Sequence, residues 1–181
     1  NSLSTLDLTN NTALIELDCY NNSFTVLDIS KNIALEYLRH DLSTLDITNN
    51  TALLYLTCRG ANITVLDVTK NILLYTPLCD DNSLTALDLT KNTALTYLDC
   101  SENSLTSLDV SENVILAGLY CYNNHLTTLN LPNNGALDYL HCYDNSLTTL
   151  DLTSNTALIE LNCSNNSIAT LDLSNNASLT Y

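Results

Sequence analysis

The stretch LTYLDCSENSLTSLDVSENVI, from Leu95 to Ile115, aligns letter under letter with the stretch that follows it, LAGLYCYNNHLTTLNLPNNGA, from Leu116 to Ala136. Numbering each unit from its first Leu as position 0 gives the consensus L-x-x-L-x-C-x-x-N-x-L-T-x-L-D-L-T-x-N-x-x. Full units begin at Leu14, Leu35, Leu53, Leu74, Leu95, Leu116, Leu137 and Leu158. Half a unit (3–13) precedes them and a stub (179–181) follows, so the repeat covers the chain.

This repeat predicts the fold class. A fixed period of this size around L-x-x-L-x-L-x-x-N/C-x-L is the signature of leucine-rich repeats. One coil cannot bury its own apolar side, so neighbouring coils must stack to form a continuous core. We therefore expect residues 1–181 to form a single β-rich leucine-rich-repeat solenoid, with 21-residue coils, a parallel β-sheet on the concave face and little or no α-helix. The expected inward positions are 0, 3, 5, 8, 10, 13, 15 and 18, and the coils within 35–94 are irregular.

Composition narrows the classes of partner. The 181 residues include 5 Lys or Arg against 20 Asp or Glu, for a formal net charge of −15. Such a surface repels nucleic acid and anionic membranes. No apolar run reaches the length of a membrane helix, so membrane insertion is not expected. The chain contains no Met and opens in mid-pattern, so we expect a processed product or a piece of a longer protein.

Position 5 is a column of cysteines. Its members are Cys19, Cys58, Cys79, Cys100, Cys121, Cys142 and Cys163. Stacked parallel strands would place them in a ladder at ~4.8 Å spacing. Disulfides are one interpretation, but side chains in register point the same way, which suits disulfide torsion poorly. We favour free, buried thiols, which behave as small hydrophobes. Thiols on one line also give no tetrahedral metal pocket.

Two further columns are polar. Asn fills position 18 in all nine available places, from Asn11 to Asn176, and position 8 in six units. Buried amides can satisfy the turn backbone of adjacent coils. Position 14 carries Asp7, Asp28, Asp46, Asp67, Asp88, Asp109, Asp151 and Asp172, with Asn130 as the exception. We favour Asx-turns for these exposed carboxylates. The alternative is calcium bound between coils, because hard cations prefer several carboxylate oxygens.

The segment LTYLDCSENSLTSLDVSEN resembles the cysteine-ladder leucine-rich repeats of internalin-type bacterial surface proteins and related secreted adhesins. The resemblance covers nearly the whole chain. It rests on the combination of Cys at position 5 with the segment L-T-x-L-D-[LIV]-[ST]-x-N in the same unit. It implies a right-handed curved solenoid, an extracellular or cell-surface location, and binding of a protein or glycan ligand.

The pattern breaks in three consecutive coils. The unit that starts at Leu35 has only 18 residues, and His40 takes its cysteine place. The next unit contains a shifted CRGANI segment from Cys58, and the one after it places Pro77 inside the expected strand, where a proline cannot donate to the sheet. A structural role for His40 is favoured. The alternative is a functional notch in which Arg39, His40 and Arg59 form a small cationic spot.

Tyrosines mark one exposed face. Nine of the ten fall at positions 2, 4 and 6 of the expected strands, interspersed with Glu16, Asp18, Asp80, Asp99 and Glu160. The second arm of the coil, which is the L-T-x-L-D-L segment of each unit, carries none. Tyrosine is a good strand residue, but this preference would place it on both arms. It also gives rigid amphipathic contact area. The candidate ligand-binding residues are Tyr37, Tyr55, Tyr97, Tyr120, Tyr122, Tyr139, Tyr143, Asp99, Arg39 and Arg59.

No catalytic motif is present. The sequence has no Gly-rich phosphate loop, no nucleophile elbow and no His/Cys/Asp constellation, so we expect a non-enzyme without a cofactor. The leading hypothesis is a binding or adhesion module that recognises a protein or glycan on another cell or matrix through its tyrosine-rich acidic face. The alternative is a structural unit of an extracellular filament or stalk, since uncapped coil ends could associate end to end. An ice-binding role for the threonine rows is a remoter alternative.

Overall fold

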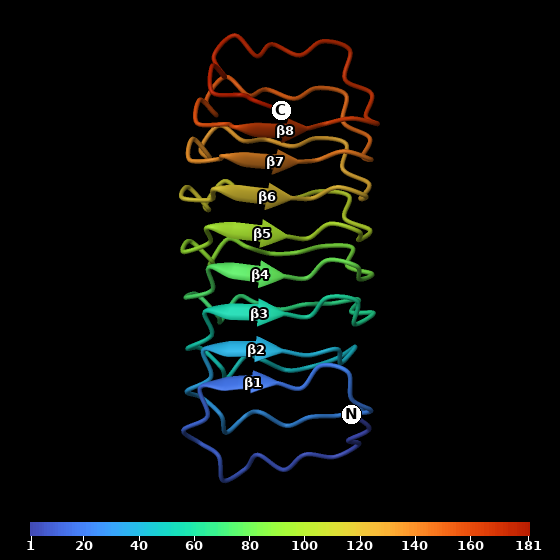
Figure 1. Cartoon of the computed structure of the whole chain (residues 1–181), viewed down its shortest axis with the longest axis vertical. Coiled ribbons are helices and arrows are strands. Elements are labelled where there is room, and N and C mark those ends of the chain that lie inside the picture. The colour runs from blue at the N-terminus through green and yellow to red at the C-terminus, as the bar shows by residue number, and fades with distance from the viewer.

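Each repeat unit folds into one coil, and the coils stack along a common axis in the computed structural model, which describes all 181 residues (Figure 1). Every full coil contributes one short strand to a single sheet. The strands are β1 (Glu16–Asp18), β2 (Tyr37–Arg39), β3 (Tyr55–Thr57), β4 (Thr76–Leu78), β5 (Tyr97–Asp99), β6 (Gly118–Tyr120), β7 (Tyr139–His141) and β8 (Glu160–Asn162). They lie parallel, in register and in chain order, so equivalent positions of successive units form straight columns. The predicted β-solenoid of leucine-rich-repeat type is confirmed.

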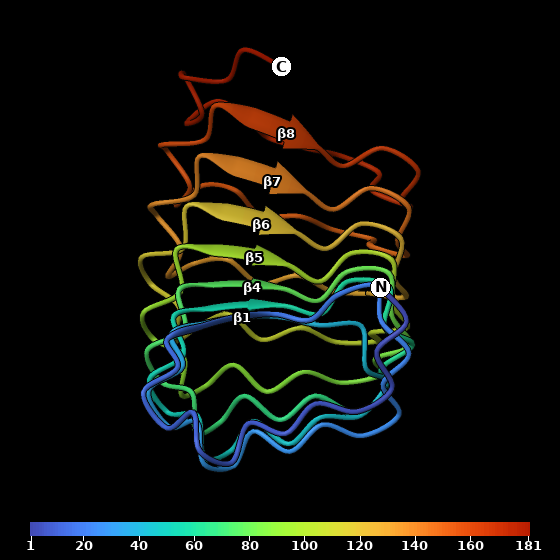
Figure 2. The same cartoon turned by 60° about the horizontal axis from the view of Figure 1, so that its bottom comes forward.

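The core runs between the sheet and the opposite arm of each coil (Figure 2). A continuous cluster of 39 buried hydrophobic residues fills this space. Most leucines at positions 0 and 3, such as Leu95 and Leu98, are fully buried, as are most at positions 10 and 15, whereas Leu14 and Leu161 in the terminal coils are partly buried. Because each coil's apolar side faces its neighbours, burial is shared along the stack rather than within one coil. The fold offers no helix that could span a membrane.

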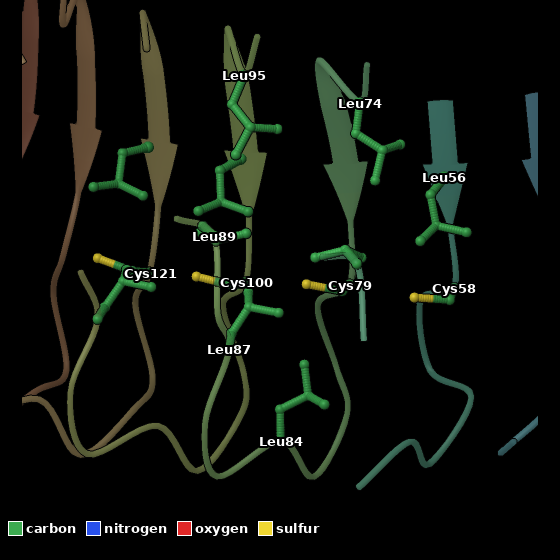
Figure 3. Packing of buried hydrophobic residues seen from close by; sticks show 14 of the residues in the cluster. Leu56, Cys58, Leu74, Cys79, Leu84, Leu87, Leu89, Leu95, Cys100 and Cys121 are labelled. Atoms are coloured by element: carbon green, nitrogen blue, oxygen red, sulfur yellow. The ribbon is translucent and has the colours of Figure 1, made fainter. Parts of the chain in front are cut away.

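The cysteine column is a ladder of free thiols. Six of the seven cysteines are buried, and Cys163 is partly exposed. Neighbouring Cβ–Sγ bonds point the same way rather than toward each other (Figure 3). Burial raises the pKa of Cys58 to about 12 and that of Cys100 well above its usual value. The thiols therefore pack as small apolar side chains, as the sequence predicts.

The asparagine columns tie each coil to the one before it. At position 8, Asn103 Nδ2 donates to Cys79 O of the preceding coil at 3.0 Å and to Ser101 O of its own coil at 3.0 Å. Its Oδ1 accepts from Leu84 N at 2.9 Å. At position 18, Asn92 Nδ2 donates at 3.0 and 2.9 Å to two carbonyls of the preceding coil. These amides satisfy turn backbone that would otherwise be buried without partners.

The aspartate column forms Asx-turns. In all eight cases Oδ1 accepts the backbone N–H two residues later. Asp88 Oδ1 also accepts a hydrogen bond from the Thr90 hydroxyl group, with 2.7 Å between Oγ1 and Oδ1. These hydrogen bonds lower the pKa of the Asp88 carboxyl group, and the same is true of its equivalents, such as Asp151. Asn130 is followed two places later by Pro132, which has no N–H to donate. The one missing carboxylate thus coincides with the one missing donor.

In the short coil at 35–52, His40 bonds to the backbone of the shortened turn. His40 is 1% exposed and occupies the cysteine column. Its Nδ1 accepts a hydrogen bond from Leu42 N at 3.2 Å, a backbone N–H whose equivalent in regular coils, such as Leu84 N, donates to the position 8 asparagine of the next coil. Burial lowers the pKa of His40 to about 4, so the ring is neutral at pH 7.

Candidate functional site

The outward positions of the sheet carry most of the tyrosines, and the rings gather into two groups. The first group comprises Tyr37, Tyr55 and Tyr75 on the coils of β2 to β4. Tyr37 and Tyr55 have ring centroids 6.1 Å apart, and Tyr55 meets Tyr75 edge-on at 4.3 Å. Tyr75 stands at position 1, which the sequence pattern did not place on this face. Its neighbour at position 2 is the small Thr76.

The second tyrosine group lies on β5 to β7 and the turns after them. Tyr97 and Tyr120 have centroids 5.0 Å apart. Tyr122 and Tyr143 are stacked at 4.4 Å, with ring planes 6° apart. Burial raises the pKa of Tyr97 well above its usual value. The rings form two amphipathic pairs, whereas Tyr139 is exposed and forms no ring pair with them.

His141 is a member of this second group that the sequence did not single out. Its ring lies 4.8 Å from Tyr120 and 6.4 Å from Tyr143, centroid to centroid. His141 Nε2 is 2.7 Å from Glu160 Oε1 of the next coil. Its place at position 4, one coil after Tyr120, is the signal that would have identified it. The histidine lies between the tilted pair of Tyr97 and Tyr120 and the stacked pair of Tyr122 and Tyr143.

Arg39, His40 and Arg59 do not form a joint cationic spot. Arg39 pairs with Asp18 of the preceding coil at 3.3 Å and lies over the ring of Tyr20 at 4.5 Å. Arg59 turns toward the following coil, where its Nε is 2.9 Å from Asp80 Oδ2. The neutral His40 is buried in the core column. In a chain this acidic, each of the two arginines is neutralised by a carboxylate of an adjacent coil.

The outward direction of position 6 holds only in part. Asp80 is 3% exposed and Ser101 is fully buried, although both stand at that position. Asp80 lines a hollow of about 500 Å³ on the sheet face. We name this hollow the β4 pocket. Its lining residues are Thr57, Arg59, Thr76, Leu78, Asp80, Tyr97 and Asp99.

Three of the predicted site residues therefore meet in one place. Arg59, Tyr97 and Asp99 line the β4 pocket, Tyr37 and Tyr55 lie on one side of it, and the remaining predicted tyrosines lie on the other. No group of three or more His, Cys, Asp or Glu side chains gathers in a way that would hold a metal ion. The arrangement offers aromatic contact area, hydroxyls and carboxylates.

Comparison with solved structures relates the fold to known proteins. The functional domain of InlJ from Listeria monocytogenes, which includes a cysteine ladder, matches with a TM-score of 0.87 and 35% identity, over 99% of this chain and 46% of that one. The internalin InlF from the same organism matches at 0.81 and 27% identity, over 95% of this chain and 54% of that one. A leucine-rich-repeat protein of Leptospira interrogans, LIC12759, matches with a TM-score of 0.79 and 22% identity, over 93% of this chain and 54% of that one.

The resemblance to cysteine-ladder leucine-rich repeats of the internalin type is thus confirmed, because the solenoid and its cysteine column recur in a solved structure. The chain spans about half the length of the solved structures it matches. No protein-family model matches the chain, and no curated protein matches it. The likeness to these structures supports a protein-binding repeat module.

Proposed function

We propose that this chain is a non-enzymatic binding module of a bacterial surface or secreted protein, and that it recognises a protein partner through the tyrosine rings of its sheet face. The observation that carries the proposal is the one-sided contact of these rings. Consecutive coils place Tyr97 against Tyr120 and Tyr122 against Tyr143, whereas the second arm of the coil carries no tyrosine. Rings fixed by their neighbours lose little rotamer freedom on binding.

The similarity to internalin-type structures supports this class of function, since those solenoids share the fold and one of them includes the cysteine ladder. A fold alone does not fix a ligand, so the ligand class is inferred from the site. Aromatic anchors beside a polar rim are typical of interface hot spots. The recurring carboxylates of the second arm are engaged in Asx-turns, and the groups on the sheet face form no nucleophile and base pair. These features favour recognition over catalysis.

The test uses arrays of purified cell-surface and matrix proteins, with a glycan array in parallel. We expect the chain to bind a protein on the array. Two paired variants, Tyr120→Ala with Tyr122→Ala and Tyr97→Ala with Tyr139→Ala, should each weaken that binding by ~1–3 kcal/mol. Circular dichroism should show both variants folded, because these side chains lie outside the leucine core.

The control pair, Thr106→Ala with Thr127→Ala, changes two exposed residues of the second arm. It should leave binding unchanged, since exposed substitutions cost within ~0.5 kcal/mol. Loss of binding in the control but not in the tyrosine pairs would move the recognition face to the second arm. Binding on the glycan array alone would replace protein by glycan as the ligand class.

A further inference from the structure

The row of tyrosines on the sheet face is interrupted at β4. Position 2 carries Tyr55 on β3 and Tyr97 on β5, but Thr76 on β4 between them. Tyr55 packs on Tyr75, with centroids 4.3 Å apart, and Tyr97 packs on Tyr120 at 5.0 Å, so Tyr97 associates with the coil that follows it. The β4 pocket, of about 500 Å³, opens where a tyrosine is missing.

Two further residues shape the pocket from outside its lining. Gly118 on β6 has no side chain, and Tyr97 lies in that space: a Cβ at Gly118 would stand 2.6 Å from Tyr97 Cδ2. Pro77 on β4 cannot donate to β5. Only Leu78 and Asp99 pair across β4 and β5, whereas the other neighbouring strands, such as β5 and β6, pair at three positions. The pocket floor is therefore set by the irregular coil, and its tyrosine wall is set by the missing side chain at Gly118.

The charges inside the β4 pocket are unbalanced. Asp80 and Asp99 face one cation, Arg59, whose side chain is 62% exposed. The Asp80 side chain is only 4% exposed, and the ion pair from Arg59 Nε to its Oδ2 is its sole contact with a donor of another residue. Burial and the nearby Asp99 raise the pKa of Asp80 to about 6 in spite of Arg59. A second cation beside such a carboxylate would favour its charged form.

We propose that the β4 pocket receives a basic side chain, arginine or lysine, of the protein partner, between Asp80 and Asp99 and against the ring of Tyr97. This inference rests on the proposed function, since it names the chemistry of one anchor of the same partner. An ammonium or guanidinium group would pair with the two carboxylates, and its alkyl stem would lie along Tyr97 and Leu78. The net charge of −15 adds attraction for a basic partner surface.

The experiment follows backbone amide signals of the full chain by NMR while Nα-acetyl-arginine amide is added, without any partner. We expect saturable shifts at Thr76, Leu78, Asp80 and Asp99. Nα-acetyl-citrulline amide, which has the same shape without the charge, should produce none. Because hydrogen bonds to charged groups are the strong ones, Asp80→Asn and Asp99→Asn should each weaken binding of the arginine amide roughly tenfold.

The matched control is Asp18→Asn. Asp18 stands at position 4, as Asp99 does, and pairs with an arginine, but it does not line the pocket. This variant should bind the arginine amide as the native chain does. Gly118→Ala, which forces Tyr97 to move, should weaken binding without removing any charge.

Each outcome decides one of the two proposals. Equal shifts with arginine and citrulline amides, shifts that scatter over the acidic surface, or no shifts would overturn the basic-side-chain site. If the tyrosine pairs still weaken protein binding in that case, the proposed function stands without this anchor. If the chain shows a saturable response to the arginine amide but the double tyrosine variants bind the protein partner as the native chain does, the tyrosine face is overturned and the basic-side-chain site stands.

Discussion

The ring of Tyr97 lies on Gly118 of the next coil, so closely that a Cβ at Gly118 would be 2.6 Å from Cδ2 and 2.9 Å from Cε2 of the ring. Gly118 is buried within β6, directly opposite Tyr97 in the strand register. The glycine therefore serves a close approach. It fixes which way Tyr97 turns, and with it the boundary between the β4 pocket and the second tyrosine group.

Gly118→Ala tests this relationship. The new methyl group must displace the Tyr97 ring, and such overpacking costs typically ~1–3 kcal/mol. Urea unfolding should show this loss, and aromatic NMR signals of Tyr97 and Tyr120 should shift. Gly135→Ala is the matched control, because its Cβ would meet nothing nearer than Ser154 O at 3.4 Å. An equal loss of stability in both variants would contradict the specific contact.

The cysteine ladder predicts the reactivity of the seven thiols. Cys163 is the only one that is partly exposed. Burial raises the pKa of all of them, to about 12 for Cys142. Because a reagent needs access and reacts with the thiolate, it should modify Cys163 first and the remaining six only after unfolding. Cys163→Ser should abolish the early reaction, and a count below seven after unfolding without reductant would show that part of the ladder is oxidised.

Two buried groups have opposite effects on the stability of the chain between pH 7 and pH 4. The pKa of His40 is about 4 in the fold against its usual 6.5, so the native state binds fewer protons and stability falls as pH falls. The pKa of Asp80 is about 6 against its usual 3.8, so the native state binds more protons and stability rises as pH falls. Over this range each shift corresponds to about 2–3 kcal/mol, and the two largely cancel. The other charged groups near Asp80 are Arg59, Asp99 and Glu102.

Single variants should separate these effects. Asp80→Asn removes the contribution that opposes that of His40, so urea unfolding should show stability falling by about 2–3 kcal/mol more than in the native chain from pH 7 to pH 4. His40→Cys, which restores the column residue, should show the opposite change relative to the native chain. Parallel pH profiles for all three proteins would refute both shifts.

The Asx-turns predict unequal effects of two similar substitutions. Asp88→Ala removes the acceptor for Thr90 N and Thr90 Oγ1 and should lower the unfolding midpoint. Asn130→Ala should cost almost nothing, because Pro132 has no N–H to lose. Thermal unfolding measures both, and equal losses would contradict the turn as the source of stability.

A chelator separates the Asx-turns from the calcium alternative. If the turns alone stabilise the aspartate column, EDTA should leave the unfolding midpoint unchanged. A fall of many degrees that calcium restores would show that the column binds a cation, since a ligand of the native state raises the midpoint.

The sequence determined the solenoid, its columns and the direction of most side chains. The repeat fixes these because every coil has the same neighbours: a leucine at position 3, a cysteine at position 5 or an asparagine at position 18 meets its own equivalent above and below. The burial of His40 followed from the same logic, since it occupies a core column. The Asp88 turn needed only the residue two places later.

The tertiary structure decided what depends on departures from the repeat. Arg59 turns toward Asp80 of the following coil, and Arg39 turns toward Asp18 of the preceding coil. Both directions depend on carboxylates that are 21 residues away in the sequence. The β4 pocket requires Thr76 and Gly118, two coils apart, because a small residue at one place and an absent side chain at the other decide where Tyr97 can lie. The repeat consensus describes what the coils share, whereas the β4 pocket depends on the few coils that depart from it.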